Sequence, residues 1–302
     1  MRYILRKDVI APVPEVEISV EEYARLEHAR KVLTSAFAIE EKYEILISNF
    51  LELERQLLHL AVTNTVRNTL TYSEFFETRS ALNISLVNVL TAARLYLDQL
   101  PQDICDCLLN SNPSAANLVK ERCSTEYDAH FEYRFMEALR NHVQHRGIPI
   151  HFISQNAHWT SFEEDRLMEY SVDILAQRRY LAEDKQFKKK TLDEVPDEVD
   201  LKAACRRYVE CLSAIHEFAR DLTAKIVKCS RASIEAAHTR YAEVYAENRL
   251  GLAAFAVADG RNVSSVPLLL EWDDVRIELQ KRNSQLVNLS KRYVTARPRG
   301  KK

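Results

Sequence analysis

The sequence is poor in the residues that interrupt helices, because its 302 residues include only 4 Gly and 8 Pro. This scarcity is typical of long helices with short connections rather than a β fold with many turns. The sequence also lacks a run of about 18 apolar residues and a signal-peptide pattern at its N-terminus. We therefore expect no membrane span and a cytoplasmic location.

Several catalytic signatures are missing as well. The six cysteines form no Cys-x-x-Cys pair, which argues against a zinc ribbon or a thioredoxin-type redox site. The sequence contains no Gly-rich phosphate loop, no Gly-x-Ser-x-Gly elbow and no His-Glu-x-x-His pattern. Nucleotide triphosphatases, serine hydrolases of that type and zinc peptidases are thereby disfavoured, and we expect no metal and no cofactor.

Charge of one sign is not in excess, since the formal net charge is -2. A nucleic acid held by bulk charge is therefore not expected, and an RNA partner would need a local basic site. Lysines and arginines do gather at 188–190 and in the tail at 297–302. Runs of this kind are most often solvated faces or chain ends.

Helix signals dominate what is present. Three capping boxes begin at Ser19, Thr71 and Thr160, each with Glu three residues later. Apolar residues recur at three- and four-residue steps, which predicts helices around 46–60, 82–93, 125–146, 201–249 and 273–293. Short strands are predicted at 3–5, 148–153, 252–257 and 266–270, with Asp259-Gly260 as a hairpin turn. The expected fold is mainly α: a helical bundle with a small accessory β-sheet or hairpin.

The most informative segment is the end of the helix predicted from about residue 125. Gly147 is expected to provide a left-handed cap, and Pro149 prevents continuation of the helix. His145 then lies in the last turn, and Asn141 lies on the same face four residues earlier. Arg140 is about 100° around the helix from Asn141, but its long side chain can reach the same spot. These groups could bind a phosphodiester, stabilise charge on its oxygens and move a proton.

Two plainer interpretations stay open at this point. About one Arg-x4-His spacing is expected by chance in a chain of this composition. Arginine and histidine near the end of a helix also serve simply to complement the helix dipole and to cap carbonyl groups.

The segment Leu139-Arg140-Asn141-His142-Val143-Gln144-His145-Arg146-Gly147 resembles the Arg-x(4–6)-His motif of the HEPN superfamily. The resemblance covers roughly residues 36–180, and the motif is its specific part. It implies a metal-independent endoribonuclease that acts as a homodimer, in which the ribose 2′-hydroxyl attacks the adjacent phosphate. His145 would then transfer protons, Arg140 would stabilise the phosphorane and Asn141 would orient the phosphate.

His142 and Arg146 are auxiliary substrate-binding candidates in this interpretation. The resemblance also implies a toxin or antiviral-defence effector, with an antitoxin or regulatory protein as a further partner class. The corresponding division of the chain is an N-terminal strand and helix at 1–35, a HEPN-like bundle at 36–180, and a third segment at 181–302. The alternative is a non-catalytic helical scaffold or RNA-binding protein, which long amphipathic helices would support equally well.

Overall fold

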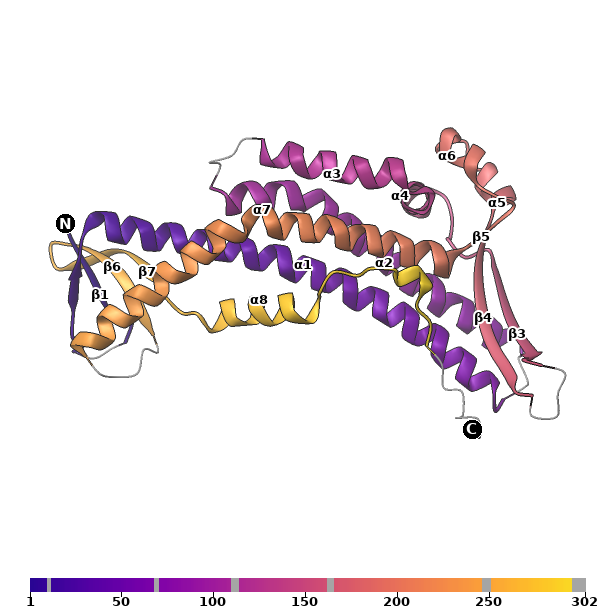
Figure 1. Cartoon of the computed structure of the whole chain (residues 1–302), viewed down its shortest axis with the longest axis horizontal. Helices are drawn as coiled ribbons and strands as arrows, with labels where there is room; N and C mark the ends of the chain where they lie inside the picture. The colour runs from indigo at the N-terminus through magenta and orange to yellow at the C-terminus, as the bar shows by residue number, and fades with distance from the viewer. Residues whose placement is uncertain (10–11, 68–70, 110–113, 162–165, 246–250, 295–302) are drawn as a thin grey trace. The chain divides into compact units, whose positions relative to one another are not determined.

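A computed structural model describes residues 1–9, 12–67, 71–109, 114–161, 166–245 and 251–294. The chain is mainly helical and carries two small antiparallel sheets (Figure 1), which confirms the predicted fold class at this level. It divides into two compact units, each assembled from three stretches of sequence. Unit 1 comprises Met1–Glu44, Tyr96–Glu121 and His216–Ser284, and unit 2 comprises Ile45–Leu95, Arg122–Ile215 and Gln285–Lys302. The predicted division into three consecutive segments stays a prediction.

The α-helices in the described residues are α1 Val20–Asn64, α2 Tyr72–Cys107, α3 Ala115–Ala129, α4 Phe131–His145, α5 Arg178–Ala182, α6 Lys189–Glu194, α7 Leu201–Val244 and α8 Glu271–Arg282. The strands are β1 Arg2–Lys7, β2 Val16–Ile18, β3 Phe152–Trp159, β4 Met168–Gln177, β5 Glu198–Asp200, β6 Leu252–Ala258 and β7 Arg261–Pro267. A short 3-10 helix, η1, spans Leu289–Lys291.

Unit 1 contains the four-stranded sheet, in the order β2-β1-β6-β7. All three pairings in it are antiparallel. Asp259 and Gly260 have φ angles of 50° and 72°, and these two positive values make the tight turn between β6 and β7 that the Asp-Gly pair predicts. Ile4 and Phe255 lie on the buried face of this sheet and belong to a hydrophobic cluster in the core of unit 1.

Unit 1 also encloses a buried polar cluster on α1, α2 and α7. Arg220 donates to both carboxylate oxygens of Glu40, at 2.9 and 2.7 Å. His216 lies 3.1 Å from Glu40 through Nε2, and Tyr96 lies 2.8 Å from its Nδ1. Burial opposes ionisation of Glu40, but the hydrogen bonds from His216 and Arg220, together with the charge of Arg220, outweigh it and lower its pKa to about 2. Burial lowers the pKa of His216, so we take its ring as neutral and as a donor to Glu40.

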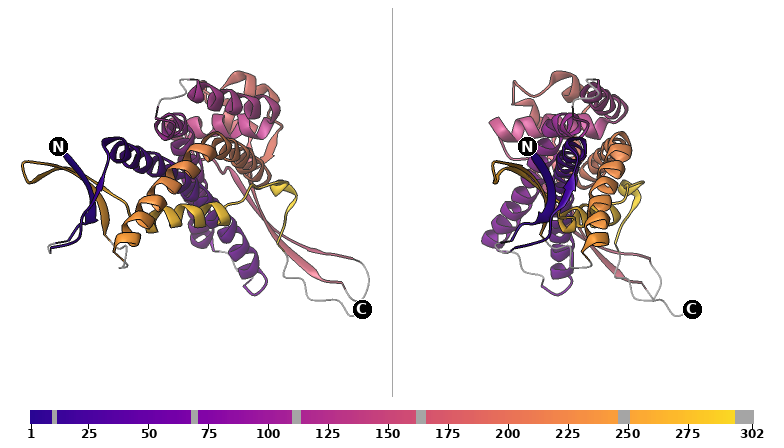
Figure 2. Two further views of the ribbon diagram at one scale, coloured as in Figure 1. Left: turned by 60° about the vertical axis from the view of Figure 1, so that its left-hand side comes forward. Right: turned by 90° about the vertical axis from the view of Figure 1, so that its left-hand side faces the viewer.

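Unit 2 is built from helices and a three-stranded antiparallel sheet, ordered β3-β4-β5. β3 and β4 form a long two-stranded ribbon (Figure 2). The apolar positions that predicted its helices are buried, among them Leu46, Leu86 and Leu139. Truncating one such leucine to alanine typically costs about 2–5 kcal/mol, so these positions hold the unit together.

By length and composition, α2 contains one window apolar enough to cross a membrane. Half of that window is buried within the protein, as in a core helix. Leu82, Leu86 and Val89, which belong to α2, are fully buried. The expected absence of a membrane partner stays a prediction.

Among the described residues, one of the three predicted capping boxes forms in full, at Thr71, and at Ser19 only one of the two reciprocal hydrogen bonds forms. The Glu22 N–H donates to Ser19 Oγ at 3.2 Å, and Thr71 and Glu74 exchange backbone-to-side-chain bonds at 2.8 and 3.2 Å. The third prediction is wrong about Thr160, which closes the β3–β4 ribbon by accepting a hydrogen bond from the Leu167 N–H. Its partner position, residue 163, lies outside the described residues.

Several predicted boundaries need correction. The strand predicted at 148–153 begins only at Phe152, and the strand predicted at 266–270 lies earlier, as β7. β7 is largely polar and exposed, so it lacks the alternation of apolar and polar residues by which a strand is predicted from sequence. The last helix ends at Arg282 rather than near residue 293, and α7 ends at Val244, with residues 246–250 outside the described part.

The helix predicted from about residue 125 is in fact interrupted. His130 has an extended backbone, with φ -124° and ψ 118°, and it separates α3 from α4. The apolar residues Tyr127, Phe131 and Phe135 keep a four-residue spacing across the break, so periodicity alone did not reveal it. The motif is therefore carried by a separate helix of 15 residues.

Candidate functional site

The site lies in unit 2, where α4 ends. Phe135 and Leu139 are fully buried and anchor one face of α4 in the core. The N–H groups of Arg146 and Gly147 both donate to the His142 carbonyl, at 2.8 and 3.3 Å, which closes the last turn. The chain then leaves the helix and the Ile150 N–H donates to Asn83 Oδ1 on α2 at 3.1 Å.

The predicted role of Gly147 as a left-handed cap is wrong. Among the described glycines, positive φ values occur at Gly251 and Gly260 and not at Gly147. The constraint at Gly147 is steric, because an added Cβ would lie 2.8 Å from His142 Nε2 and 3.3 Å from its Cε1. Glycine therefore leaves room for the imidazole of His142 rather than providing an unusual backbone angle.

His142 is held by an acidic partner far away in the sequence. Its Nδ1 lies 2.8 Å from Asp184 Oδ2, and both side chains are more than nine-tenths buried. Burial opposes ionisation of Asp184, but hydrogen bonds from His142 and the Gln186 N–H, with the charge of Arg146, lower its pKa. An ionised Asp184 fixes a proton on His142 Nδ1 and so leaves Nε2 as the nitrogen available for other chemistry.

A cavity of about 720 Å³ opens beside this pair. Its lining is mostly polar and consists of Arg79, His142, Arg146, Gly147, Ile148, His151, Tyr180, Glu183, Asp184 and Lys185. Three of these residues are cationic, namely Arg79, Arg146 and Lys185. Two carboxylates, Glu183 and Asp184, face these three cations. Because the charge of Asp184 is engaged by His142 and by Arg146 at 3.6 Å, the lining keeps an excess of positive charge that suits an anionic group such as a phosphate.

A second histidine of the cavity is neutral. The Gln177 N–H donates to His151 Nδ1 at 2.9 Å, which places the ring proton on Nε2. Burial, followed by the charges of His142 and Arg79, lowers the pKa of His151 to about 4. His151 is therefore a neutral hydrogen-bond donor at physiological pH, at a ring separation of 6.5 Å from His142.

The predicted catalytic residues lie outside the cavity lining. Asn141 and His145 are exposed, and within the described part of the chain neither side chain forms an intramolecular hydrogen bond or ion pair. Arg140 is partly buried and donates to Gln144 Oε1 at 2.6 Å. The structure thus places the auxiliary residues, His142 and Arg146, in the cavity and leaves Asn141 and His145 exposed to solvent outside its lining.

Sequence reasoning missed most of the cavity. Asp184 and Arg79 come from segments far from the motif, and no local spacing connects them to it. His151 stands close to the motif in sequence, but only the return of the chain along β3 and β4 brings it against Tyr180, at a ring separation of 5.0 Å. A single sequence carries no signal for such pairings.

One group of side chains with metal-ligating geometry occurs among the described residues, and it does not include the motif. It consists of Glu126, His130 and Cys211, at the other end of α4. Comparison of the chain with protein-family models, with curated proteins and with solved structures finds no match.

Proposed function

We propose that the protein is a metal-independent endoribonuclease of HEPN type and that the end of α4 is its catalytic centre. The observation that carries the proposal is the exposure of Asn141 and His145, whose side chains form no intramolecular hydrogen bond or ion pair within the described chain. Their sequence neighbours His142 and Arg146 line the cationic cavity. The side chains of Asn141 and His145 are therefore available to a ligand.

The reaction requires no metal or redox partner. An imidazole takes the proton of a ribose 2′-hydroxyl, whose oxygen then forms a bond to the adjacent phosphorus. The bond from phosphorus to the 5′-oxygen breaks, and that oxygen takes a proton from a general acid. The products are a 2′,3′-cyclic phosphate and a 5′-hydroxyl, so atoms and charge balance without a co-reactant.

The side chains have distinct roles in this proposal. His145 exchanges the proton, Asn141 orients the phosphate, and Arg140 turns from Gln144 to the phosphate when RNA binds. Arg146 and the other cations of the cavity hold a neighbouring phosphate of the same strand. A homodimer would supply a second copy of the motif, and with it the second proton-transfer group.

A non-catalytic RNA-binding or scaffold protein is the second candidate. It is favoured by the pairing of His142 with Asp184, which is also how a structural histidine is held. The long helices α1 and α7, of 45 and 44 residues, suit such a scaffold as well. On this view the cavity binds a phosphate and breaks no bond.

The test is cleavage of a labelled RNA pool by the purified protein in EDTA, with circular dichroism recorded in the same buffer. General acid–base groups contribute roughly 10²–10⁴-fold, so His145→Ala should slow cleavage by at least about 100-fold. His59→Ala is the matched control, because His59 is an exposed histidine on α1 in unit 2. Loss of activity in His142→Ala with full activity in His145→Ala would move the chemistry into the cavity. Absence of cleavage by the folded wild type would favour the scaffold.

A further inference from the structure

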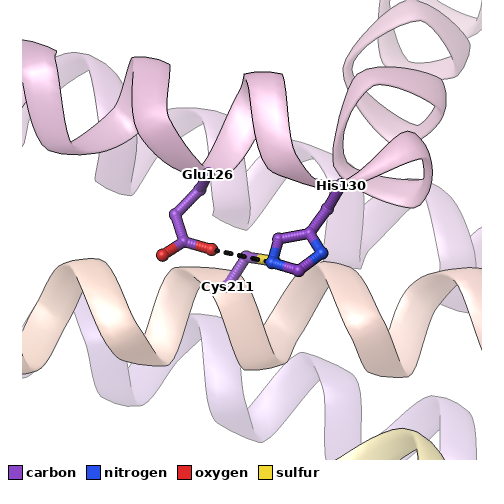
Figure 3. Close-up of side chains that lie close together, drawn as sticks. All are labelled: Glu126, His130 and Cys211. Atoms are coloured by element: carbon purple, nitrogen blue, oxygen red, sulfur yellow. Dashed lines mark ion pairs between the residues drawn. The ribbon is translucent and has the colours of Figure 1, made fainter.

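We propose that Glu126, His130 and Cys211 form a zinc site that ties the junction of α3 and α4 to α7. The three side chains converge from two separate segments of unit 2 (Figure 3). Their ligand atoms all lie within 4.8 Å of one another. This site is remote from the motif, since α4 runs for 15 residues between His130 and its end.

The spacing of the donors suits a tetrahedral cation. His130 Nε2 and Glu126 Oε2 are 3.5 Å apart. Two ligands at zinc-to-nitrogen and zinc-to-oxygen distances of about 2.0–2.1 Å stand about 3.3 Å apart in a tetrahedron. The thiol of Cys211 needs to approach within about 3.6 Å of both, which shortens a separation of at most 4.8 Å by about 1.2 Å at most.

The chemical types of the three ligand atoms favour zinc over other metal ions. One thiolate, one imidazole and one carboxylate form a mixed sulfur, nitrogen and oxygen set, which is typical of zinc and unsuited to calcium or magnesium. Three protein ligands leave a fourth position for water.

Glu126 is paired with Arg122 through one carboxylate oxygen and keeps the other for this role. Arg122 donates to Glu126 Oε1, so the other oxygen, Oε2, is the one that faces His130. His130 occupies the N-cap position of α4, yet its side chain makes no capping hydrogen bond. The ring is turned toward Glu126 and Cys211 (Figure 3). Its extended backbone breaks the helix at the point where the imidazole reaches α7.

Cys211 is buried and has Glu126 as its acidic neighbour. A bound divalent ion would supply the positive charge that stabilises a thiolate beside this carboxylate.

Cobalt(II) is the probe, because a thiolate ligand gives it a near-ultraviolet charge-transfer band that zinc abolishes by displacement. The metal-free wild type should bind one cobalt ion per chain with this band, and zinc should raise its melting temperature. Cys211→Ser should lose the band. Glu126→Gln, which preserves the shape of the site, should weaken cobalt binding at least about tenfold.

Cys205→Ser is the matched control, since Cys205 is also a buried cysteine of α7 in unit 2 but lies outside the cluster. It should bind cobalt as the wild type does. The proposal is overturned if the folded wild type binds neither cobalt nor zinc, or if Cys211→Ser retains the band. Both readouts are independent of RNA cleavage, so they test this site separately from the proposed function.

Discussion

Gly147→Ala tests how the end of α4 is built. The new Cβ would lie 2.8 Å from His142 Nε2, closer than non-bonded atoms approach. The ring cannot simply turn away, because Asp184 holds its Nδ1 at 2.8 Å. Either the backbone of Gly147 moves or the His142–Asp184 hydrogen bond lengthens.

The expected magnitude follows from this contact. Overpacking of this kind costs about 1–3 kcal/mol, and we expect the free energy of unfolding to fall by that amount. Gly147 has no positive φ, so backbone strain adds nothing. Without the clash, alanine would even stabilise the chain by about 0.4–1 kcal/mol, because it restricts the unfolded state.

A double-mutant cycle separates these effects. Urea denaturation is measured for the wild type, Gly147→Ala, His142→Ala and the double variant. In the His142→Ala background the alanine should be neutral or stabilising, so the coupling energy should equal or exceed the cost of the single variant. An equal loss of stability in both backgrounds would show that the chain needs glycine for its backbone, and would refute the steric explanation.

Three further predictions concern buried charge. The pKa of Glu40 is lowered from 4.5 to about 2, so its stabilisation is complete above pH 4.5 and is lost as the pH falls toward 2. The 2.5-unit difference corresponds to about 3 kcal/mol at most, and urea denaturation across this range should show a flatter profile for Glu40→Gln. His151 should stay neutral until about pH 4, and an NMR titration with a midpoint near its usual value of 6.5 would contradict its burial. Asp273 is fully buried and accepts hydrogen bonds from Arg231 and Arg276, each at 2.6 Å. Asp273→Ala should therefore lower the free energy of unfolding by about 3–5 kcal/mol, and a loss below about 1 kcal/mol would contradict that role.

The helical class could be predicted from the sequence because helix signals are local. Capping at Ser19 and Thr71 involves residues three apart, and apolar periodicity marks one face of each helix. The turn at Asp259-Gly260 is local in the same sense. The exposed, polar strand β7 was misplaced because its register depends on β6 rather than on its own composition.

The sequence could predict only those site residues that lie within about one turn of one another on α4. The spacing from Arg140 to His145 pointed to the end of α4, where His142 and Arg146 line a cavity. Asp184, the partner of His142, is brought to it by the reversal of the chain along β3 and β4, which local spacing does not encode. Cys211 likewise comes close to His130 only through the packing of α7, so no local spacing of cysteines could indicate this cluster.

The most direct test of the central claim is single-turnover cleavage of one oligoribonucleotide and of its copy with a single 2′-deoxy substitution at the cut site. The account predicts that the wild type cleaves only the all-ribose strand, without added metal, and leaves a 2′,3′-cyclic phosphate. It also predicts that His145→Ala loses this cleavage while His59→Ala retains it. Cleavage of the 2′-deoxy copy at the same position, or full activity in folded His145→Ala, would contradict the account.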